Sequence, residues 1–150
     1  MAPRLVAVNH GTLTLANTPT SVTLDAVDTT SDLTIARAAY LHIERILGTG
    51  ASPIIDISLE PASAESARNK SPLHTSELTP IGALGLYGLE DVDAAGMHLI
   101  LDVSHYLPKI SKHIQQQKQI RLLLQPRWEM SEEAAVSIGR VALYVNDAKQ

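Results

Sequence analysis

Apolar and polar residues alternate along much of this chain, and the alternation predicts β-strands that bury one face. It is clearest in residues 119–145, which we interpret as two long strands joined by a polar connection. The first of these strands has apolar residues on both faces, as expected for a strand in the middle of a sandwich. Pro126 predicts the end of that strand, because proline cannot donate a hydrogen bond to the ladder.

The second of these strands changes the face that carries its apolar residues. Val136 and Ile138 share one face, whereas Val141 and Leu143 share the other. One residue must be absorbed between the two pairs, because otherwise half of the strand would turn its apolar side chains to water. We predict a β-bulge at Gly139, since glycine adopts a positive φ at little cost.

Shorter stretches of alternation predict the remaining strands. They are residues 12–15, 22–24, 55–59, 81–87 and 97–103. Residues 33–46 contain good helix formers and allow a helix, but they also alternate, and we favour a strand. Gly48 and Gly50 follow, and they predict a hairpin that pairs this strand with residues 55–59. The glycines within residues 81–87 indicate a close approach of another backbone or a bend.

One short helix is predicted near residues 104–114. Asp102 or Ser104 is the candidate N-cap, because both side chains accept hydrogen bonds from the first free N–H groups of a helix. Pro108 falls in the first turn or just past it, where proline shortens the helix or marks its start.

The predicted elements define a mainly β protein, an antiparallel β-sandwich or flattened barrel with this one helix. A chain of 150 residues is expected to form a single domain. Residues 61–80 lack apolar periodicity and predict a long flexible loop, and a loop of that length is either functional or disordered.

The composition excludes several classes of function. The chain has no cysteine, which removes disulfides, thiolate zinc sites and cysteine nucleophiles and leaves the compartment open. No apolar run approaches about 18 residues, so we expect no membrane span. Scattered basic residues, a formal net charge of −4 and few aromatic residues argue against nucleic-acid binding. No G-x-S-x-G nucleophile motif occurs, and we expect no catalytic residue in this chain.

The six histidines invite a copper site, because imidazole suits copper. They are His10, His42, His74, His98, His105 and His113. Two ligands on one helix need a separation of three or four residues, and no pair has it. We therefore expect neither a metal site nor any other cofactor site made by this chain alone.

Five segments carry short motifs in a recognisable order. They are residues 39–44 (AYLHIE), 83–88 (ALGLYG), 97–107 (MHLILDVSHYL), 121–127 (RLLLQPR) and 136–144 (VSIGRVALY). Their order and spacing resemble the C-terminal β-domain of tyrosinases and plant polyphenol oxidases. The resemblance implies a lid that covers a dicopper centre and keeps the enzyme latent. The copper lies in a separate helical domain of that family, and that domain is not part of this sequence.

The resemblance implies a non-catalytic domain that covers or stabilises a tyrosinase-like dicopper catalytic domain or subunit. The candidate partner-contact or plugging residues are Leu73, His74, Leu78 and Trp128. Leu73 and Leu78 either plug a partner or fix their own loop to the domain. Trp128, the single tryptophan, either anchors a partner or caps the core.

Two other classes of function stay open. A structural protein of this class forms homo-oligomers through its edge strands. A binder of small ligands, or an enzyme, uses a pocket at one end of the sandwich.

Overall fold

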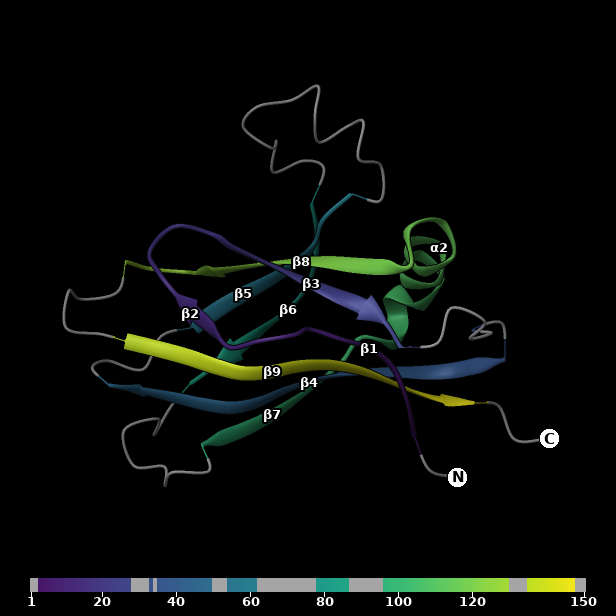
Figure 1. The fold of residues 1–150 in the computed structure, drawn as a ribbon. Helices are drawn as coiled ribbons and strands as arrows, with labels where there is room; N and C mark the ends of the chain where they lie inside the picture. The colour runs from purple at the N-terminus through teal and green to yellow at the C-terminus, as the bar shows by residue number, and fades with distance from the viewer. Residues whose placement is uncertain are drawn as a thin grey trace.

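A computed structural model describes residues 3–27, 33, 35–49, 54–61, 78–86, 96–129 and 135–147 of the protein. These residues form nine strands and one short helical segment (Figure 1). Every strand pairing is antiparallel. The predicted class, a mainly β sandwich or flattened barrel with one short helix, is confirmed, since the sheet curls into a nearly closed barrel.

The elements follow one another along the chain with the helical segment near the end. The strands are β1 (Arg4–Val8), β2 (Leu13–Leu15), β3 (Thr20–Ala26), β4 (Ala36–Thr49), β5 (Ile54–Leu59), β6 (Thr79–Gly85), β7 (Met97–Asp102), β8 (Gln119–Pro126) and β9 (Ala135–Asp147). The helical segment is η3 (Ser104–Tyr106) followed by α2 (Leu107–Gln117). In space the sheet order is β6-β5-β8-β3-β1-β9-β4-β7, and β2 also pairs with β9. Strands β8 and β9 each have neighbours on both sides, and β8 ends at Pro126, as predicted.

The two strands at the ends of this order approach each other through a glycine. Gly82 of β6 lies against Leu101 of β7, and a Cβ atom added at Gly82 would meet the Leu101 Cδ2 atom at 2.5 Å. The glycines of residues 81–87 predicted the approach of another backbone or a bend, whereas the neighbour of Gly82 is the Leu101 side chain. This contact brings the edge strands β6 and β7 next to each other and the sheet close to a closed barrel.

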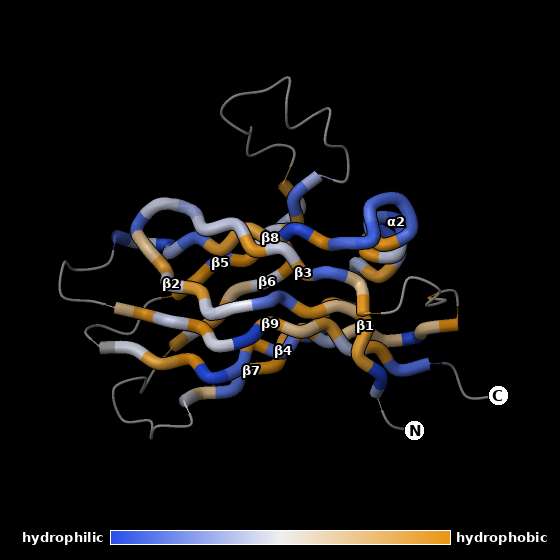
Figure 2. Tube along the Cα trace, viewed as in Figure 1, coloured by the Kyte–Doolittle hydropathy of each residue, from blue (hydrophilic) through white to orange (hydrophobic). Residues whose placement is uncertain are grey.

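The interior is filled by the inward-facing residues of each strand. In β8 the buried residues are Ile120, Leu122, Leu124 and Pro126. The strands alternate between apolar and polar residues in Figure 2. Burying a side chain of this size contributes roughly 1.5–3 kcal/mol each. Helix α2 covers the end of the barrel where β8 begins, and it adds Ile110 and Ile114 to the core.

The segment that allowed a helix or a strand forms the long strand β4, which confirms the strand. The predicted hairpin with residues 55–59 is wrong, because β4 pairs with β9 and β7, whereas β5 pairs with β6 and β8. The physical reason is length. A strand of 14 residues satisfies more of its backbone hydrogen bonds against the 13-residue β9 than against the six-residue β5.

The short helix is confirmed, but neither predicted residue is the N-cap of α2. That position is Tyr106, which makes no side-chain capping bond. Pro108 lies in the first turn of α2. Because proline has no N–H, this turn has one fewer backbone donor that needs a capping partner. Asp102 and Ser104 instead fix the preceding turn: the Asp102 carboxylate accepts the Ser104 N–H at 2.9 Å, and the Ser104 hydroxyl oxygen accepts the Ala39 N–H at 3.0 Å.

The predicted loop of residues 61–80 lies mostly outside the described residues, which leave out 62–77. Its last part is not loop, because β6 already begins at Thr79. In the described part of the chain, no helix is long and apolar enough to cross a bilayer.

One histidine belongs to the core. His113 of α2 is only 3% exposed. Burial lowers its pKa below the ordinary value of 6.5, and the positive charges of Lys109 and Lys112 lower it further. The native state therefore holds this imidazole neutral. In the interval between the lowered pKa and 6.5, the unfolded chain binds a proton that the native state does not bind.

We expect the free energy of unfolding to fall as the pH is lowered through about 6.5. In the variant His113→Leu the same change of pH should lower the free energy of unfolding by a smaller amount. The variant removes the group that binds the extra proton in the unfolded chain. Urea unfolding at about pH 7.5 and about pH 5.5 measures the loss. The exposed His105 offers a control, since His105→Leu should lose as much as the wild type. An equal loss in all three proteins would contradict this role of His113.

Candidate functional site

The outer face of β7, β4 and β9 carries polar and aromatic side chains. On β4, Leu41 and Ile43 face the core, so the intervening His42 and the following Glu44 face outward. His42 is paired across the ladder with Ile100 of β7, which is 58% exposed. This register places outward residues of three strands next to one another.

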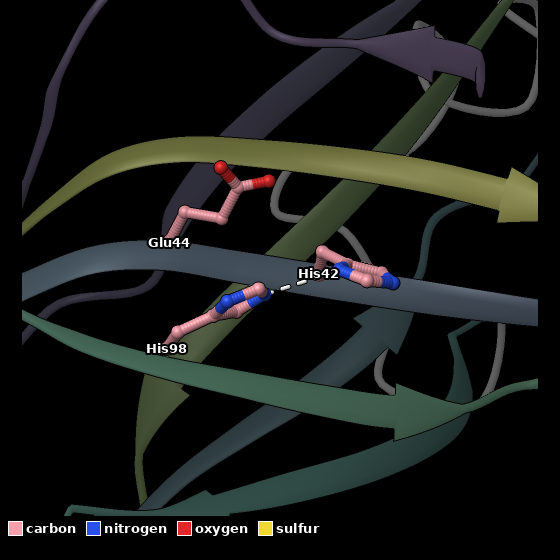
Figure 3. A group of neighbouring side chains, drawn as sticks. All are labelled: His42, Glu44 and His98. Carbon is pink, nitrogen blue, oxygen red and sulfur yellow. Dashed lines mark hydrogen bonds between the residues drawn. The ribbon is translucent and has the colours of Figure 1, made fainter.

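Two histidines from different strands meet on this face. The His42 Nδ1 atom lies 3.0 Å from the His98 Nε2 atom, so that one ring donates a hydrogen bond to the other (Figure 3). His98 precedes Ile100 by two residues and therefore points to the same side of β7. The other side of the His42 ring packs on the Tyr144 ring of β9, with centroids 4.5 Å apart. The pair is thus held by a hydrogen bond and by ring packing.

Glu44 adds a carboxylate to the pair. One oxygen of Glu44 and one ring nitrogen from each of His42 and His98 all lie within 4.8 Å of one another. The carboxylate is turned toward β9 in Figure 3, where both of its oxygens lie 3.4 Å from the Arg140 Nη1 atom. We call His42, Glu44 and His98 the imidazole–carboxylate cluster.

A β-bulge lies beside the cluster. The register between β4 and β7 shifts by one residue between Ile43 and Ile46, which are both buried, and Arg45 takes a positive φ of 54°. A non-glycine residue in this region is strained, and bulges re-aim side chains next to functional sites. Here the bulge sets the direction of the Glu44 side chain relative to His98.

The bulge predicted at Gly139 is only partly correct. The change of face in β9 occurs there, since Ile138 and Val141 are both buried. However, Gly139 does not take a positive φ, and Arg45 opposite takes it instead. Gly139 is required for space, because a Cβ atom there would lie 2.6 Å from the Arg45 Nε atom and 2.8 Å from its Cβ atom.

The surroundings of His42 favour the neutral imidazole. Burial lowers its pKa below 6.5, the neighbouring His98 and Arg140 also lower it, and Glu44 opposes them. A neutral ring offers a free electron pair on one nitrogen, which is the form that binds metal ions. The cluster therefore places a carboxylate and a second imidazole beside the His42 ring, whose neutral form is able to act as a ligand.

The structure describes two of the four predicted partner-contact residues and does not bring these two together. Leu73 and His74 lie outside the described residues. Leu78 is half-buried and precedes β6, while Trp128 follows β8 and is 65% exposed, so it does not cap the core. Thr79, next to Leu78, pairs with Leu59 at one end of β5, and Arg127, next to Trp128, bonds to Ile54 at the other end. The two ends of β5 are roughly 17 Å apart, given the rise per residue of a β-strand.

A shallow hollow lies elsewhere, between the start of β4 and α2. Its volume is about 410 Å³, and its lining residues are Leu33, Ala36, Ser104, Leu107, Pro108 and Ser111. Among the described residues that line it, none has a side chain that titrates near neutral pH.

The fold and the cluster define an antiparallel, barrel-like β-domain with an imidazole–carboxylate cluster on its solvent-facing side. The chain belongs to a family described as a domain of unknown function (DUF7868), whose model matches residues 4–146. No curated protein matches the sequence.

We expect Gly139→Ala to destabilise the fold by about 1–3 kcal/mol, because the new methyl group overlaps Arg45. The overlapping atoms belong to the Arg45 side chain, so the same substitution in an Arg45→Gly background should cost less than about 1 kcal/mol. Chemical denaturation of the four proteins completes this double-mutant cycle. Equal costs in both backgrounds would mean that Gly139 serves another purpose.

Proposed function

We propose that this chain is a non-catalytic β-domain that covers or stabilises a partner, and that the partner is a tyrosinase-type dicopper catalytic domain or subunit. The class of partner rests on the resemblance of the sequence motifs. The observation that carries the docking role is the exposed Trp128, because tryptophan is among the residues that contribute most to protein–protein binding.

Trp128 extends from a turn that β5 holds in place. The Arg127 Nη2 atom lies 2.7 Å from an Asp56 oxygen, and the Arg127 backbone N–H donates to the Ile54 carbonyl at 2.8 Å. The Arg127 guanidinium also lies over the indole, 5.9 Å from its centroid. A side chain on a turn that is already ordered loses little freedom on binding, which favours its use as an anchor.

The proposed mechanism is steric. A domain that covers the entrance of the copper site excludes phenols until the contact is broken. A standard interface of roughly 1,600 Å² is enough for a stable complex of this kind. The copper that oxidises phenols belongs to the partner in this proposal.

We expect the chain to bind a copper-loaded tyrosinase core from the same source and to lower its phenol oxidation. Trp128→Ala should weaken binding by ~30-fold or more, the effect of losing a hot-spot residue. Val27→Ala is the matched control, because Val27 is 53% exposed and follows β3 at the end away from Trp128. Sizing chromatography and the oxidation rate at several chain concentrations give both readouts.

Three results would contradict the proposal. Unchanged oxidation together with the absence of a complex would reject the lid. Equal losses in Trp128→Ala and Val27→Ala would reject Trp128 as the anchor. Concentration-dependent self-association without any complex would favour homo-oligomers formed through the edge strands β6 and β7 instead.

A further inference from the structure

We propose that His42, Glu44 and His98 bind a first-row divalent transition-metal ion, with Zn²⁺ as the reference ion. This site is independent of the proposed partner, and it departs from our expectation that the chain makes no metal site. It is assembled from two strands that are distant along the sequence, since His42 and His98 are 56 residues apart.

The donor atoms suit such an ion. Two imidazoles and one carboxylate occur as ligands of zinc and of non-haem iron, and imidazole also suits copper and nickel. Two ligands at about 2.0–2.1 Å from one ion, at angles between tetrahedral and octahedral, lie about 2.9–3.4 Å apart. The His42 Nδ1 and His98 Nε2 atoms, 3.0 Å apart, already have this spacing.

Metal binding replaces the hydrogen bond between the rings. In the free protein one ring donates its N–H to the other ring. In the bound form both nitrogens direct electron pairs to the ion, and the proton of the donating ring moves to the other nitrogen of that ring. The donating ring keeps its proton, which moves from one of its nitrogens to the other, so metal binding by this exchange releases no proton.

The carboxylate requires a small movement. The three donor atoms lie within 4.8 Å of one another, whereas two ligands of one ion are at most about 4.2 Å apart. Glu44 has flexible torsions, and its contacts with Arg140 at 3.4 Å are long for charged hydrogen bonds. Rotation of Glu44 away from Arg140 and toward the imidazoles would complete the site. The exposed His98 leaves the remaining coordination positions accessible to water or to another ligand.

The backbone holds the ligands on rigid elements. Strand β4 is hydrogen-bonded on both sides, to β7 and to β9. The strained Arg45 lies next to Glu44, and two glycines make room for it: a Cβ atom at Gly96 would lie 2.9 Å from the Arg45 Cα atom, and Gly139 lies against the Arg45 side chain. Such strain occurs where a binding site requires it, and an exposed pair of polar contacts alone gives little stability in return.

Titration of the full, tag-free chain with ZnCl₂ by calorimetry tests the proposal. We expect one ion per chain, with affinity at least ~10-fold lower in His42→Ala and His98→Ala. The control His105→Ala removes an exposed histidine outside the cluster and should bind like the wild type. Circular dichroism confirms that each variant is folded. The visible spectrum of bound Co²⁺, as a substitute for Zn²⁺, should change in His98→Ala and stay the same in His105→Ala.

Arg140→Gln should act in the opposite direction. It removes a positive charge beside the ion and releases Glu44, so we expect affinity to rise by about 3- to 10-fold. Unchanged or weaker binding in Arg140→Gln would mean that Glu44 is not a ligand, and it would overturn the three-ligand site. Equal affinity in His98→Ala and His105→Ala, or competition by Ca²⁺ at the same concentration as Zn²⁺, would overturn the proposal as well, because Ca²⁺ prefers oxygen ligands.

Discussion

The pairing of β4 with β9 is the constraint on which the rest of the structure depends. The ladder runs from Ala36 opposite Asp147 to Thr49 opposite Ala135, and it is the longest ladder among the described strands. Strand β9 also pairs with β1 and β2, while β4 pairs with β7. The ladder therefore joins β4 and β7 to the other strands of the sheet. Its hydrogen bonds pair the backbone N–H and C=O groups of two strands, and these groups would otherwise be buried without partners.

The same ladder explains why the candidate metal site lies where it does. Both strands change their buried face at one level, where Glu44 is opposite Arg140 and Arg45 extends over Gly139. Two long strands of a curled sheet must bend together, and a single residue with a positive φ provides the bend for both. Alternation along β4 turns His42 and Glu44 outward, and the bend sets the position of Glu44 relative to His98. The strain of the fold and the geometry of the cluster thus have a common origin.

Local features of the fold could be predicted from the sequence, and nonlocal ones could not. Alternation predicted β4 and β8 because the period of a strand shows in its own residues. The sequence placed apolar residues on both faces of β8, but only one face is buried, and Leu123 on the other is half-buried. The partner of β4 did not follow, since Gly48 and Gly50 predicted a hairpin with β5, and glycine signals report only neighbouring segments. The cluster was missed for the same reason: ligand spacing was considered along one helix, whereas His42 and His98 meet only through the register of β4 and β7. The signal available in the sequence was the spacing of His42 and Glu44, which are two residues apart on a predicted strand and therefore share one face.

The division of the sheet into two faces lets one barrel carry independent sites. The core is built almost entirely from inward residues such as Leu41, Ile43 and Leu143, so the outward residues contribute little to its packing. Replacing His98 or Trp128 removes an exposed side chain and leaves the interior intact, and functions are added to a fold through such positions. Because Trp128 follows β8 and the cluster spans β4 and β7, loss of one site leaves the atoms of the other in place. The proposed docking and the proposed metal binding are therefore separable, and each proposal succeeds or fails on its own residues.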